Sequence, residues 1–121
     1  MDYSLGKSKR LKSQKLIGLL FQKGKRVSSF PILATYRTID VQNSTQQGNR
    51  VAFSVPKKKI KLAVKRNLLK RRMREAYRLQ QHLLPPGYHI MFVWQSTEVL
   101  DYEQIYSAMQ QVLMQLAEKN K

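Results

Sequence analysis

The sequence contains no cysteine among its 121 residues, so the chain forms no disulfide and offers no thiolate as a nucleophile or metal ligand. It has only two histidines, His82 and His89, and its seven carboxylates are scattered along the chain. Neither group is spaced like a metal site or like the acid and base of a catalytic pair. We therefore predict no catalytic residue and no metal site in the protein itself, and a structural role for both histidines.

Long apolar runs are also missing. The apolar run nearest the N-terminus, residues 16–21, is six residues long, is interrupted by Gly18 and is followed by the basic segment QKGKR without a cleavage site of small residues. This pattern differs from a signal peptide, and a membrane-spanning helix needs about 20 consecutive apolar residues. We expect a soluble protein with no membrane partner, and the lack of cysteine favours the cytoplasm.

Acidic residues are few and basic residues are many. The chain has 23 lysines and arginines against seven acids, which gives a formal net charge of +16 and an isoelectric point near 10.4. Eight of the basic residues lie in positions 1–26 and eleven in 57–78. A compact protein with this charge repels itself, and a polyanionic partner relieves that repulsion. Nucleic acid is therefore the first candidate partner, and an anionic membrane surface is the second.

The spacing of apolar residues predicts an α+β fold in one domain that covers residues 1–121. We expect residues 1–10 to form a disordered basic arm, because they are polar and terminal. The predicted elements are a helix over 11–23, a strand over 30–39, a hairpin turn over 40–49, a strand over 50–55, a helix over 60–83, a central strand over 88–94 and a last helix that starts at a capping box formed by Asp101 and Gln104.

The helix predicted over 60–83 separates an apolar stripe from a basic face, because each residue turns the helix by about 100°. The stripe that we expect to face the sheet consists of Leu62, Leu69, Met73, Ala76 and Tyr77. The displayed face consists of Asn67, Lys70, Arg71, Arg74 and Arg78, with Arg66 at the border, from which it would reach along the sheet.

The charge on this helix distinguishes between four interpretations. Residues 57–78 contain eleven basic residues and a single acid, Glu75, whereas a solvated helix face usually mixes both signs. A membrane-surface helix would need its apolar stripe free to enter lipid, and no helix-turn-helix pairing accompanies the segment to indicate DNA. A helix that binds folded RNA is therefore favoured.

The segment FSVPKKKIKLAVKRNLLKRRMREAYR resembles the protein subunit of bacterial ribonuclease P. That family has a strand, a Lys-Lys pair and a helix that opens with Ala-Val-x-Arg-Asn-Arg and continues x-Lys-Arg-x-x-Arg-Glu. The matching residues are Lys57, Lys58, Arg66, Asn67, Lys70, Arg71, Arg74 and Glu75. Leu68 stands where the family usually has a second arginine. Segments 10–27, 49–55, 85–94 and 100–116 fall where the family has its other elements, so the resemblance covers nearly the whole chain.

This resemblance implies a fold and a function. The fold is an α-β-β-β-α-β-α sandwich whose βαβ crossover is left-handed, whereas nearly all such crossovers are right-handed. The function is that of an accessory subunit, inactive alone, of an enzyme whose catalytic RNA uses Mg²⁺ to remove the 5′ leader from precursor tRNA. The basic helix would bind the catalytic RNA through Asn67, Lys70, Arg71, Arg74 and Arg78. The single-stranded leader would lie in a cleft between the first helix and the sheet, at Ile17, Phe21, Tyr36, Arg50, Lys57, Lys58 and Arg66.

Three alternatives remain open at this point. Phe21 is either a platform on which bases stack or a core aromatic. Tyr36 stands beside Thr35, where the family often has a tyrosine, and a shift of one residue reverses the face of a strand. The third alternative concerns the class of protein, because a non-enzymatic RNA-binding protein, such as a ribosomal protein, would have a similar composition.

Overall fold

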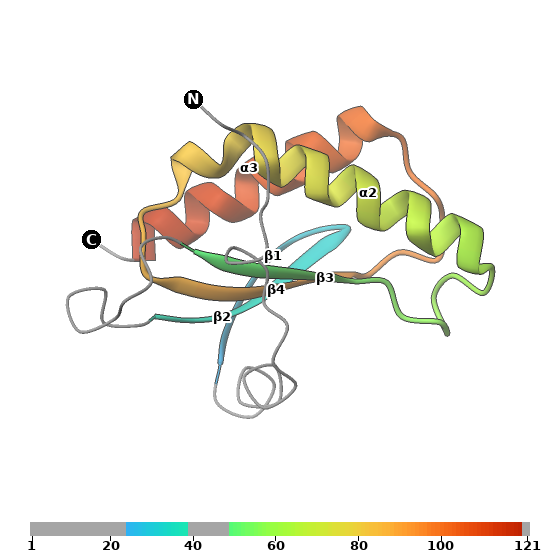
Figure 1. Cartoon of the computed structure of the whole chain (residues 1–121), viewed down its shortest axis with the longest axis horizontal. Helices are drawn as coiled ribbons and strands as arrows, with labels where there is room; N and C mark the ends of the chain where they lie inside the picture. Colours follow the sequence, from blue (N-terminus) through green and yellow to red (C-terminus); the bar gives the residue numbers. More distant parts are fainter. Residues whose placement is uncertain (1–23, 39–48, 120–121) are drawn as a thin grey trace.

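The computed structural model describes residues 24–38 and 49–119, which form a four-stranded sheet with two helices on one of its faces (Figure 1). The predicted basic arm and first helix lie outside the described residues, and so does most of the turn predicted at 40–49. Ile17 and Phe21 belong to this part of the chain, and their predicted roles stay predictions.

The sheet has the strand order β1-β2-β4-β3. Its strands are β1 (Lys25–Ser29), β2 (Ile32–Thr38), β3 (Arg50–Ser54) and β4 (Tyr88–Trp94). β4 is central, as its nearly continuous apolar sequence predicts, and it pairs antiparallel with β2 and parallel with β3. This arrangement leaves β1 and β3 as the edges of the sheet.

Two features of the sheet differ from the prediction. The strand predicted from residue 30 starts at Ile32, because Phe30 and Pro31 form the turn that joins β2 to β1, a strand that the apolar pattern did not indicate. The hairpin predicted between 30–39 and 50–55 is wrong, because β4 lies between β2 and β3 and pairs with both. A central position lets both edges of β4 satisfy their backbone hydrogen bonds, which matters for a strand that is buried almost throughout.

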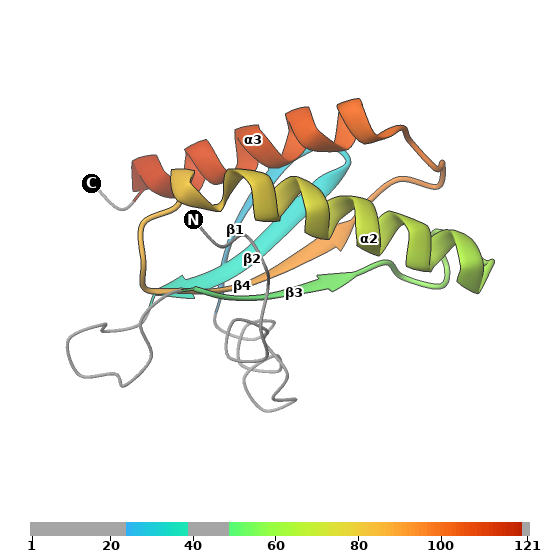
Figure 2. The same ribbon diagram turned by 45° about the horizontal axis from the view of Figure 1, so that its top comes forward.

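Two helices cover one face of the sheet. α2 spans Ala63–Gln80 and continues as the short 3-10 helix η2 (Gln81–Leu83), and α3 spans Tyr102–Lys119. The predicted capping box is confirmed at the start of α3, where the Gln104 amide donates to Asp101 Oδ1 at 2.9 Å and the Asp101 amide donates to Gln104 Oε1 at 3.4 Å. α2 connects the parallel strands β3 and β4 in a left-handed crossover, which can be followed in Figure 2.

α2 begins later than predicted. The backbone amide of Ile60 donates to the Pro56 carbonyl at 3.1 Å, which closes a turn over residues 57–59 and carries Ile60 into the core ahead of the helix. Leu62 is therefore not part of the inward stripe and is 59% exposed. Gln80 joins the stripe instead, where its side-chain amide donates to the Tyr106 carbonyl of α3 at 3.1 Å.

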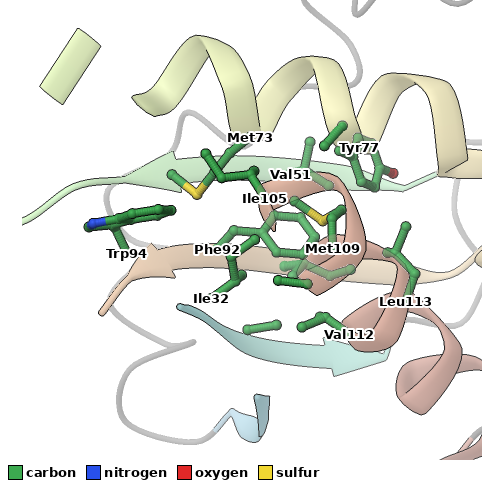
Figure 3. Close-up of a cluster of buried hydrophobic side chains, with 14 of the residues drawn as sticks. Ile32, Val51, Met73, Tyr77, Phe92, Trp94, Ile105, Met109, Val112 and Leu113 are labelled. Carbon is green, nitrogen blue, oxygen red and sulfur yellow. The ribbon is translucent and has the colours of Figure 1, made fainter. Parts of the chain in front are cut away.

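The hydrophobic core lies between the sheet and the two helices (Figure 3). Alternate side chains of the strands meet the stripes of α2 and α3 there, and the predicted stripe of α3 is confirmed as fully buried. Its members are Ile105, Met109, Val112, Leu113 and Leu116. We call the sheet face that meets the helices the inner face, and we call the opposite sheet face the outer face.

Candidate nucleic-acid interface

The strand register decides which side chains lie on the outer face. Tyr88, Ile90, Phe92 and Trp94 of β4 are buried against the helices, so the alternate residues of β4 point to the outer face. His89 is the first of these, and it lies directly opposite Arg37 of β2 on one side and Arg50 of β3 on the other. We call Arg37, His89 and Arg50 the cationic row.

Two further rows continue along the outer face. In the second row Met91 lies opposite Thr35 and Ala52, and Thr35 pairs in turn with Arg26 of β1. The third row runs across the sheet through Ser28, Leu33, Val93 and Ser54. The outer face is therefore positive at one end and mixes small, polar and apolar side chains toward the other. It places Arg50, Ala52 and Ser54 on one side of β3 as predicted.

His89 is the most enclosed member of the cationic row. It is 6% exposed, and neither of its ring nitrogens has a hydrogen-bond partner in the described part of the chain. Burial lowers the pKa of His89 below its ordinary value, and the positive charges of Arg37 and Arg50 lower the same pKa further. The imidazole is therefore neutral at pH 7 in the free protein. The sequence offered no sign of this environment, because it requires three strands in register.

Tyr36 does not share the outer face with Arg50. Its side chain lies on the inner face, is 4% exposed and packs against Tyr88 with ring centroids 5.8 Å apart. Thr35 takes the outer position instead. The structure thus corrects the placement of Tyr36 in a cleft with Arg50, and the reason is the alternation of side chains along β2.

Lys57 and Lys58 follow the C-terminal end of β3 and are exposed in the turn over residues 57–59.

Arg66 does not extend along the sheet as predicted. Its guanidinium turns back and Nη1 donates to the carbonyls of Ile60 at 3.0 Å and Lys61 at 2.7 Å. These two carbonyls precede α2, so they accept no hydrogen bond from an amide of the helix. The guanidinium of Arg66 binds them instead and links the segment before the helix to α2.

The displayed face of α2 is basic, as the helical period predicts. Asn67, Arg71 and Arg74 are exposed, and Lys70 and Arg78 are half-buried. Arg78 forms an ion pair with Glu75, whose pKa is lowered mainly by this hydrogen bond.

Arg74 and Arg72 point to different sides of α2. The guanidinium carbon of Arg74 lies 5.9 Å from the centre of the Phe53 ring on the edge strand β3. Arg72, by contrast, points away from this face, because its Nη1 donates to the Leu100 carbonyl before α3 at 2.7 Å. The basic face of α2 is therefore oriented toward solvent and the β3 edge.

The cationic row and the basic face of α2 lie on opposite sides of the sheet, since both helices cover the inner face (Figure 2). The lysine turn at 57–59 lies at the same β3 edge, but at the opposite end of β3 from the cationic row. Fixed cations on both sides suit a polyanion that wraps around one edge of the protein, or two separate segments of nucleic acid.

The parts of the chain that the structure describes also bear on two other kinds of site. Within residues 24–38 and 49–119, no three histidine or carboxylate side chains are grouped so as to hold a metal ion. None of the described helices is both long enough and apolar enough to cross a bilayer.

Comparison with known proteins identifies relatives over almost the whole length. A sequence profile described as Ribonuclease P matches residues 5–117. The ribonuclease P protein component of Porphyromonas gingivalis is 35% identical over 122 residues, which cover 95% of this chain and 88% of the relative. That of Vibrio parahaemolyticus is 29% identical over 119 residues, which cover 98% and 97% of the two chains.

Solved structures of ribonuclease P proteins have the same fold as this chain. The ribonuclease P protein of Thermotoga maritima superposes with a TM-score of 0.74 at 22% identity, covering 88% of this chain and 96% of the other. That of Staphylococcus aureus superposes with a TM-score of 0.72 at 23% identity, covering 87% and 92%.

Proposed function

The chain belongs to the ribonuclease P protein family and is an RNA-binding subunit of that ribonucleoprotein, and from this premise we propose how its two basic surfaces divide the work. The basic face of α2 binds the catalytic RNA. The outer face of the sheet binds the single-stranded 5′ leader of precursor tRNA, and the holoenzyme removes that leader to leave the mature 5′ end.

The observation that carries this proposal is the placement of cations on opposite sides of one sheet. Asn67, Arg71 and Arg74 form a rigid, exposed helical surface, which suits the phosphates of a folded RNA. The outer face instead presents Ala52 and Ser54 beside Arg50, so that an extended strand can approach the sheet closely. Such contacts carry little base information, so the leader is bound with little regard to its sequence.

The catalytic chemistry belongs to the RNA subunit in this proposal, and Mg²⁺ is bound mainly by that RNA. The family resemblance supports this assignment. The protein contributes binding and orientation of the substrate.

Reconstitution tests the proposal. The full-length protein is combined with a bacterial ribonuclease P RNA, Mg²⁺ and precursor tRNA that carries a 5′ leader, with mature tRNA as the matched ligand. We expect cleavage with the RNA present, no cleavage by the protein alone, and a gain in affinity from the protein for the leader-bearing substrate only. Cleavage by RNA-free protein, or an equal gain for mature tRNA, would contradict the proposed division of work.

A further inference from the structure

The cationic row combines features that are costly to place together. His89 is a buried polar side chain whose two ring nitrogens lack hydrogen-bond partners within residues 24–38 and 49–119, and Arg50 Nε is also buried without one there. Unsatisfied buried polar atoms each destabilise a fold, because they have lost their hydrogen bonds to water without replacement. Their concentration between two arginines indicates a site that is completed by something outside the described chain.

Among the residues that the structure describes, the charges around His89 have one sign. Arg37 faces it from β2 and Arg50 from β3, and Arg26 of β1 lies in the next row. The described carboxylates belong to the helices and to the loop before α3, and the helices lie on the other side of the sheet. A ligand that matches this positive charge is an anion with several acceptor oxygens.

We infer that Arg37, His89 and Arg50 form a phosphate subsite at which binding of an RNA phosphodiester is coupled to uptake of a proton by His89. This inference rests on the proposed function, because the phosphate belongs to the RNA strand on the outer face. It adds a specific contact and a pH dependence to that face.

The geometry supplies the contact. Side chains directly opposite each other on antiparallel strands, as Arg37 and His89 are, have Cβ atoms about 4.5–5.5 Å apart. Arg50 is the partner of His89 on the parallel side and is close enough for its charge to act on the imidazole, so the imidazole lies within reach of both arginine side chains. Arg37 is exposed and Arg50 is half-buried, so their guanidiniums can hold a phosphate from two sides. A protonated imidazole between them adds a donor to the phosphate, which also satisfies the buried ring.

The proton linkage follows from the change in charge. In the free protein, burial and the two arginines keep the pKa of His89 low. A bound phosphate offsets the positive charge and accepts a hydrogen bond from the charged imidazole, so it raises that pKa. Between the low pKa of the free protein and the higher pKa of the complex, binding takes up a proton. Affinity then increases as the pH falls, by at most tenfold per pH unit for one proton.

The chain contains its own control. His82 is the only other histidine, and it is exposed in η2, on the helical side of the molecule. The imidazole signals of the two histidines are assigned in nuclear magnetic resonance spectra by means of His82→Gln. The full-length protein is titrated between pH 5 and pH 8 in the absence and presence of a five-nucleotide single-stranded RNA, and in a second series with inorganic phosphate.

We expect the midpoint of His89 to move to higher pH with the RNA, and that of His82 to stay in place. Arg37→Gln/Arg50→Gln should abolish the movement, and this variant keeps the test valid if substitution of His89 prevents folding. The affinity of the wild type and of His82→Gln should rise as the pH falls, whereas that of His89→Gln should stay flat.

Three results would overturn the inference. If the RNA binds without moving the midpoint of His89, or if His89→Gln keeps the pH dependence of the wild type, the subsite is wrong while RNA binding by the outer face stands. The third result is that the five-nucleotide RNA does not bind at any pH although the protein still assembles with the catalytic RNA. The inference then fails together with the proposed binding of the leader by the outer face, whereas binding of the catalytic RNA by the basic face of α2 stands.

Discussion

Replacement of Arg71 and Arg74 by alanine separates binding by the α2 face from mere exposure of charge. Both side chains are exposed, and we expect each to contact one phosphate of the catalytic RNA. Each lost phosphate contact lowers the magnitude of the slope of log K against log salt by about 0.9 for a duplex with the charge density of B-DNA and by about 0.7 for single strands. The double variant should therefore lower this slope by roughly 1.4–1.8.

This change in slope has a measurable consequence. With a change of about 1.6, the affinity advantage of the wild type shrinks roughly ninefold when the salt concentration is raised fourfold. The fold should survive, because Arg71 faces solvent and the position of Arg74 over the Phe53 ring is worth only about 0.5–1 kcal/mol at an exposed site. Equilibrium unfolding, followed through the fluorescence of the buried and only tryptophan, Trp94, verifies this.

The assay is a salt titration of the affinity for ribonuclease P RNA. Arg72→Ala is the matched control, since it removes the same charge from the same helix at a side chain that points to the Leu100 carbonyl. Arg71→Ala alone should lower the magnitude of the slope by about 0.7–0.9, and Arg72→Ala should leave it nearly unchanged. If the double variant keeps the slope of the wild type, the basic face of α2 is solvated surface and the reasoning is refuted.

Three further predictions concern the scaffold that positions these surfaces. Burial raises the pKa of Tyr77 to about 12, partly offset by a hydrogen bond with Asn49, so its contribution to stability is complete below about pH 10 and is lost as the pH rises through 12; urea unfolding at increasing pH should show this loss, and Tyr77→Phe should lessen it. Asp101→Ala should lower the free energy of unfolding by about 0.5–2 kcal/mol through loss of the α3 cap, with Asp101→Asn close to the wild type in the same measurement. Arg66→Ala should lower the free energy of unfolding by about 1–3 kcal/mol, because two charged hydrogen bonds to the turn before α2 are lost; unchanged thermal and urea unfolding would show that the turn holds without them.

Local sequence patterns determined several parts of this protein. The apolar stripe of α3 follows from the helical period of 3.6 residues, and the capping box at its start follows from two residues that are three positions apart. Both were predicted as the structure has them. The same period separated the buried stripe of α2 from its basic face. The family could also be identified from the sequence, because its motif combines charge and spacing within one continuous segment.

The outer face, by contrast, required the tertiary structure. Alternation along a strand predicts which residues of that strand share a face, but it does not indicate which strand is the neighbour or in what register. The hairpin predicted for β2 and β3 failed for this reason, and so did the placement of Tyr36 beside Arg50. Arg37, His89 and Arg50 are far apart in sequence, and only the insertion of β4 between β2 and β3 aligns them in one row. The environment that keeps His89 neutral therefore arises from long-range pairing, which no local pattern of residues encodes.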